Sequence, residues 1–247
     1  MRLFDGFFDF GQGLHFLARY THVLFGITWI GLLYFFNFVQ VPAFAEMDPA
    51  ARSEALRKIT FRALWWFRWA SALTVGSGLI MWAIGGKDYK PSTSLGLSIT
   101  LGTILGLTMA ANVWMVIWPN QQINISSAEK VAGGGEADPA AAGAAKAAGR
   151  ASRVNAFFSI PMAFFMVFTN HFAPYFSNGG AGARTGVWIL FLVIFLFAEL
   201  SALGKLPGGL DSPFCKMVLD DHKKVIQAGI AFTAVMYFIG WELILGS

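Results

Sequence analysis

The chain has 247 residues and a formal net charge of +4, and only 13% of its residues are Asp, Glu, Lys or Arg. So few charges cannot cover a water-soluble surface, because charged residues make up about a quarter of an ordinary soluble domain. Hydrophobic residues make up 56% of the chain and gather in long apolar runs, which predicts an integral membrane protein and excludes a nucleic-acid-binding domain. The single Cys215 excludes an intrachain disulfide, an iron–sulfur cluster and a covalently attached c-type haem.

Apolar runs long enough to cross a bilayer follow one another along the whole chain. They predict one domain over residues 1–247, an all-α bundle of six transmembrane helices at 14–41, 61–84, 95–118, 154–172, 186–203 and 225–246. The alternative for the first run is a signal peptide, since Ala43 and Ala45 form a small-x-small pattern before Glu46. That run is much longer than the apolar region of a signal peptide, which favours a transmembrane helix.

The loops between these spans predict the orientation. Lys and Arg are concentrated in the first, third and fifth loops, and such loops stay in the cytoplasm. We therefore expect a multi-pass protein of the bacterial inner membrane with both termini in the periplasm. The third loop contains an Ala/Gly-rich stretch, 126–153, with few bulky apolar residues, and we expect it to be a flexible cytoplasmic linker.

The first span carries His15, Arg19 and His22 on one side of a helix. The two histidines are about 10.5 Å apart along the axis, too far for both to bind one metal ion. His171 near the outer end of the fourth span falls in the same leaflet, which suggests a b-type haem held by His171 with His22 or His15, and with Arg19 on its propionates. The alternatives are copper or no cofactor, the histidines then being interfacial residues with their polar tips in water.

Three further polar residues lie near the predicted cytoplasmic face of the spans. Glu199 in the fifth span is a candidate proton carrier or ion-pair partner. Asn112 and Gln121 are candidates for hydrogen bonds between helices. Because polar side chains are costly inside a bilayer, these positions are where a function is expected.

Three segments of the chain carry a family resemblance: RYTHVLFGITWIGLLYFFNF, MAANVWMVIWPNQQ and RVNAFFSIPMAFFMVFTNH. Together they resemble the membrane-embedded N-terminal domain of the bacterial cytochrome c-linked urate oxidases, also called urate hydroxylases. The resemblance implies a helical membrane domain that oxidises urate to 5-hydroxyisourate and passes the electrons to a cytochrome c. By position, it also implies that recurrent family residues stand at His22, Asn112, Pro119, Gln121 and His171.

The first functional hypothesis is a membrane redox module that acts in oxidation or electron transfer. Because the chain contains no haem-attachment motif, we expect its electron acceptor to be a separate periplasmic cytochrome c or another subunit of a membrane complex. The alternative is a non-catalytic accessory subunit of a larger respiratory or other electron-transfer complex, with Phe-rich faces that contact other subunits. A transporter comes third, because the polar residues in the spans lie near the faces of the bilayer and not at its midplane.

Overall fold

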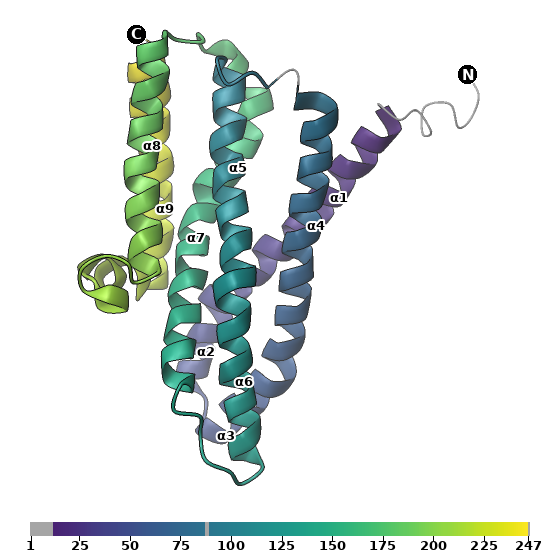
Figure 1. Ribbon diagram of the computed structural model, residues 1–247, viewed down its shortest axis with the longest axis vertical. Helices are drawn as coiled ribbons and strands as arrows, with labels where there is room; N and C mark the ends of the chain where they lie inside the picture. The colour runs from purple at the N-terminus through teal and green to yellow at the C-terminus, as the bar shows by residue number, and fades with distance from the viewer. Residues whose placement is uncertain (1–11, 87–88, 247) are drawn as a thin grey trace.

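The computed structural model describes residues 12–86 and 89–246, and the regular structure among them is helical throughout. The two chain ends, which were expected in the periplasm, lie outside the described residues. The longer helices run along one axis and form a bundle, and α1 crosses behind α4 and α5 at an angle (Figure 1). The α-helices are α1 Gln12–Tyr34, α2 Val41–Glu46, α3 Pro49–Ala55, α4 Phe61–Gly85, α5 Ser94–Asn112, α6 Trp118–Ala132, α7 Ala141–His171, α8 Ala181–Ala202 and α9 His222–Val235.

Wider π-helical turns join several of these helices into longer ones. They are η1 Phe35–Gln40 between α1 and α2, η2 Leu56–Thr60 between α3 and α4, η4 Val113–Ile117 between α5 and α6, and η8 Met236–Leu245 after α9. The chain between α8 and α9 contains η6 Gly209–Asp211 and η7 Cys215–Leu219, and η5 Ala173–Tyr175 follows α7. Continuous helices therefore carry the chain from one end of the bundle to the other.

Five continuous helices are long and apolar enough to cross a membrane, at 12–46, 94–132, 141–171, 181–202 and 222–245. This supports a multi-pass membrane protein, but the sixth expected span, 61–84, is not among the five. That segment forms α4, whose first half carries Arg62 and Arg68. The guanidinium of Arg68 lies 3.8 Å from the ring centroid of Trp118, a cation–π contact that lowers the cost of placing this charge among apolar helices.

One end of the bundle extends beyond α8 and α9. This end, called the long end below, consists of α2, α3, the last turns of α6 and the first turns of α7 (Figure 1). The continuous helix 94–132 has 39 residues and is about 58 Å long, roughly twice the 30 Å hydrocarbon thickness of a bilayer. The helices at the long end are therefore expected to project into the aqueous phase.

The Ala/Gly-rich stretch 126–153, expected to be a flexible linker, is instead helical over most of its length. α6 continues to Ala132 and α7 begins at Ala141. Ala144, Ala148 and Ala151 are buried in the described structure. Their small side chains allow neighbouring segments to approach closely, which is why a stretch with few bulky residues packs well here.

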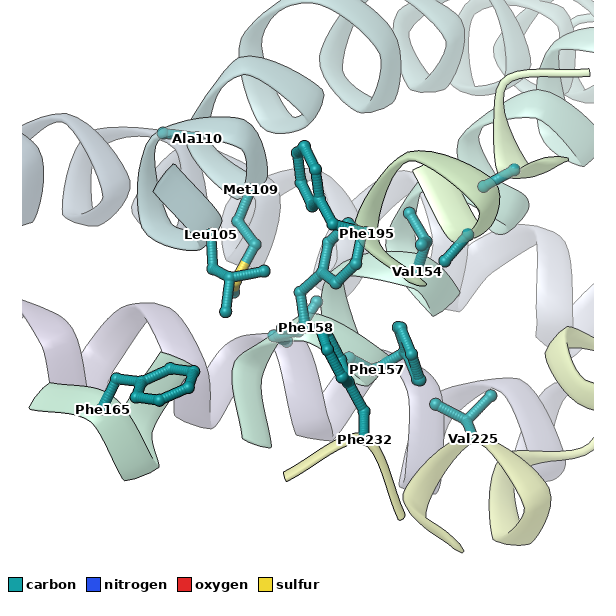
Figure 2. Close-up of a cluster of buried hydrophobic side chains, with 14 of the residues drawn as sticks. Leu105, Met109, Ala110, Val154, Phe157, Phe158, Phe165, Phe195, Val225 and Phe232 are labelled. Carbon is teal, nitrogen blue, oxygen red and sulfur yellow. The ribbon is translucent and has the colours of Figure 1, made fainter. Parts of the chain in front are cut away.

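Phe side chains fill the core between α5, α7, α8 and α9 (Figure 2). Phe157 of α7 stacks on Phe232 of α9 with ring centroids 5.5 Å apart, and Phe158 of α7 packs on Phe195 of α8 at 5.3 Å. Met109 of α5 lies on the other side of this cluster and is fully buried. The aromatic core thus fixes the positions of the helices that carry the polar cluster described below.

Arg150, a buried arginine of α7, holds the connector between α8 and α9 at several points. Arg150 Nε donates to the carbonyl oxygen of Leu210 at 3.0 Å, and its Nη1 donates to that of Cys215 at 3.2 Å. The same guanidinium forms an ion pair with Asp220. Three points of the connector therefore depend on a single side chain that is 6% exposed.

Arg150→Leu is expected to lower the free energy of unfolding by about 2–4 kcal/mol, because two backbone carbonyls lose their donor. The buried thiol of Cys215 should then become accessible, so the rate of maleimide labelling in detergent measures the effect. Lys146→Ala is the control: it breaks only the exposed 2.6 Å ion pair with Asp211 and should leave labelling unchanged. Equal labelling rates in the two variants would contradict the anchoring role of Arg150.

Candidate functional site

A carboxyl group and two amides meet inside the bundle, where three helices face one another. Asn112 at the end of α5 donates from Nδ2 to Asn155 Oδ1 of α7 at 3.0 Å and to Glu199 Oε2 of α8 at 3.1 Å. Asn155 Nδ2 in turn donates to the carbonyl oxygen of Met109 at 2.9 Å. All three side chains are less than 9% exposed, so this amide–carboxyl cluster is a closed polar site in an apolar core.

The charge on Glu199 has no counter-ion in this cluster. No Lys, Arg or His lies within ion-pair distance of its carboxyl group among the residues that the structure describes. Burying a carboxylate without a cation is costly, and its neighbours here are neutral amides. A carboxyl group in such surroundings is suited to accept and release a proton.

Two of these residues were candidates from the sequence, and the structure brings them together. Asn112 and Glu199 were singled out because polar side chains are rare in the spans. Asn155 was missed as a site residue, although its position as an amide in an apolar run was the same kind of signal. That the three side chains meet depends on the rotation of three helices, which the sequence pattern does not specify.

His22 lies in the interface between α1 and α4. Its Nδ1 is 2.8 Å from the carbonyl oxygen of Thr74, so this nitrogen carries the proton and Nε2 keeps its lone pair. The ring packs where Gly78 has no side chain, since a Cβ there would lie 3.1 Å from the His22 Cε1 atom. A histidine whose other ring nitrogen is held by a carbonyl is typical of a metal ligand.

The other predicted ligands lie elsewhere. His171 is exposed and lines an apolar groove of about 350 Å³ between α7 and η8, together with Phe168 and Tyr237. His15 is half-buried on α1, near Gly85 of α4, and Arg19 is exposed. The upper part of α1 leans away from the upper end of α7, with α4 between them in the view of Figure 1.

The described residues therefore provide one candidate axial ligand, His22, and do not bring it together with His171. They also contain no group of three or more His, Cys, Asp or Glu side chains that could hold a metal ion. His22 and His171 contact different helices, and the b-type haem stays a prediction from the sequence.

Gln121 belongs to neither site and lines a pocket at the long end of the bundle. The pocket has a volume of about 300 Å³ and is bordered by η1, η2, α6 and the first turns of α7. Two buried arginines, Arg150 and Arg153, are among its lining residues. The long end thus holds a basic cavity that the sequence analysis did not predict.

A comparison with known protein families found a match that extends from α5 into α8. Residues 92–201 match the model of a family described as urate oxidase N-terminal. Over this stretch, the chain is similar to the urate oxidase N-terminal family. No curated protein and no solved structure matches the chain.

The matched segment, 92–201, contains the whole amide–carboxyl cluster. Asn112, Asn155 and Glu199 come from three different helices of that segment, and Gln121 and His171 also lie within it. His22 lies before the matched residues. The cluster therefore lies within the matched residues, whereas the His22 site is formed by helices that precede them.

Proposed function

We propose that this protein is the membrane module of a urate-oxidising system of the bacterial inner membrane. It oxidises urate to 5-hydroxyisourate and passes the electrons to a separate acceptor, such as a periplasmic cytochrome c. The observation that carries the proposal is the position of the buried Asn112–Asn155–Glu199 cluster wholly within the segment that matches the urate oxidase N-terminal family. Buried ionisable groups in membrane helices are often functional.

The oxidation of urate releases protons that the amide–carboxyl cluster could take up. Conversion of urate to 5-hydroxyisourate adds one oxygen atom from water and releases two electrons and two protons. The electrons go to the acceptor, and the protons need a group that takes them up away from bulk water. Glu199 is suited to take up these protons after they have left the substrate, because Asn112 orients its carboxyl group and Asn155 holds Asn112 against the backbone of α5.

The test is anaerobic turnover of urate by the purified protein with ferricyanide as a one-electron acceptor. The expected result is loss of urate with two equivalents of ferricyanide reduced per urate consumed, and with no need for oxygen. An optical spectrum of the same sample, before and after reduction, tests the predicted haem separately. Failure to consume urate with ferricyanide and with cytochrome c would overturn the proposal and favour an accessory subunit.

A further inference from the structure

The pocket at the long end of the bundle combines apolar walls with amide and hydroxyl groups. Its lining includes Val41 of α2, at the end of the bundle that carries α2 and α3 (Figure 1). Its volume of about 300 Å³ lies at the lower limit of small-molecule sites in proteins. The apolar lining residues include Phe36, Leu64 and Ile117, and the uncharged polar ones are Asn37, Gln40, Thr60, Gln121 and Ser152.

Arg153 gives this pocket a positive charge that is not directly paired with a carboxylate, since Asp220, which also lines the pocket, and Asp221 act on it only at longer range. Its side chain is 9% exposed, its Nη1 donates to the carbonyl oxygen of Leu219 at 3.1 Å, and no carboxylate of the described residues lies within 4.0 Å. The neighbouring Arg150 is paired with Asp220, and Lys146 at the rim is paired as well. A buried guanidinium that is not directly paired with a carboxylate is costly, and the pocket lining carries Lys146, Arg150 and Arg153 against Asp220, so this pocket is suited to an anion.

The amides add hydrogen-bond donors around the same cavity. Gln40 Oε1 accepts from the Thr60 hydroxyl at 3.0 Å, and Gln121 Oε1 accepts from Asn124 at 3.3 Å. Both glutamines therefore keep their Nε2 donors, for which the described residues provide no partner. Together with Arg153, these N–H groups match an anion that carries several carbonyl oxygens.

We propose that this pocket binds a planar heterocyclic anion, with Arg153 as its counter-charge and Gln40 and Gln121 as donors to its carbonyl oxygens. The apolar walls suit the faces of a flat ring, which a bare phosphate or sulfate does not have. Urate, the substrate of the proposed function, is such an anion at neutral pH. Only the choice of urate rests on the proposed function; the charge and the donors are properties of the pocket itself.

Binding of radiolabelled urate to the purified protein without an electron acceptor, measured by equilibrium dialysis, tests the assignment. Arg153→Gln should lower the affinity at least tenfold, because a charge-assisted contact to the anion is lost. Arg153→Lys keeps the charge and should recover part of the affinity. Arg62→Gln makes the same change at an exposed arginine that does not line the pocket and should bind like the wild type.

Gln121→Leu removes a donor but no charge, so it tests the pocket without a change in electrostatics if Arg153→Gln fails to fold. It should lower the affinity severalfold. Wild-type affinity in both Arg153→Gln and Gln121→Leu, or no urate binding by the wild type, would overturn the proposal. Competition by inorganic phosphate as effective as that by unlabelled urate would also overturn it, because the pocket would then select charge and not a ring.

The same variants separate this inference from the proposed function. Urate that binds but is not oxidised would support the pocket and contradict the redox role. Turnover that continues with an unchanged KM in Arg153→Gln would support the redox role and place the substrate elsewhere.

Discussion

Glu199→Gln is expected to lower the rate of urate-dependent ferricyanide reduction by about 100-fold while leaving thermal stability unchanged. General acid–base groups contribute about 10²–10⁴ to rates, and an amide cannot exchange a proton in this way. Gln has nearly the same shape as Glu, and its Oε1 can accept the same hydrogen bond from Asn112. The structural role of the side chain is therefore kept and only its acid–base chemistry is lost.

A matched control makes this prediction sharp. Glu242→Gln makes the same chemical change at an exposed carboxyl group that accepts a hydrogen bond from Tyr237 near the other end of the bundle. This control should turn over at the wild-type rate. Full activity in Glu199→Gln would remove Glu199 from the proton path, and a lowered thermal midpoint would mean that its role is structural.

The polar cluster illustrates how much of the site the sequence predicts. The cost of burying polar groups in a bilayer pointed to Asn112 and Glu199 separately, and that argument needs no knowledge of packing. Their meeting with Asn155 depends on how α5, α7 and α8 rotate about their axes. Contacts with neighbouring helices determine that rotation, and the Phe core between α7, α8 and α9 supplies many of them.

For the histidines too, the sequence predicts which residues share a helix face but not which neighbouring helix that face contacts. Helical spacing predicts that His15 and His22 share one face of α1, and both lie near α4 in the structure. The proposed partner, His171, instead lines the groove between α7 and η8. Depth in the membrane could be read from the loops, but the direction in which each side chain points could not.

Composition was a poor guide to the long end of the bundle. A stretch rich in Ala and Gly suggested a linker, yet its alanines pack in α7 and its two arginines, Arg150 and Arg153, are buried. Small residues next to long cationic ones allow a helix to approach its neighbours while the guanidinium groups reach distant carbonyls. This arrangement forms the basic pocket. A search of the sequence for runs of bulky apolar residues therefore does not detect it.

Gly229→Val is expected to lower the free energy of unfolding by about 3 kcal/mol, because α9 and α7 touch at this residue. A Cβ at Gly229 would lie 2.9 Å from the carbonyl oxygen of Phe157 and 2.7 Å from Ile160 Cδ1. The backbone oxygen cannot turn aside, so the two helices would have to separate. Thermal unfolding in detergent measures this effect, with Gly143→Val as the control, since nothing lies within 4 Å of a Cβ there.

The loss of close packing at Gly229 should also reach the polar cluster. Phe157 and Phe232, which stack across the same interface, would move apart, and water could enter the core that surrounds Asn155 on α7. Turnover of urate by Gly229→Val should therefore fall together with its stability, whereas Gly143→Val should retain both. A variant with a lowered thermal midpoint but full activity would show that the cluster does not depend on the α7–α9 contact.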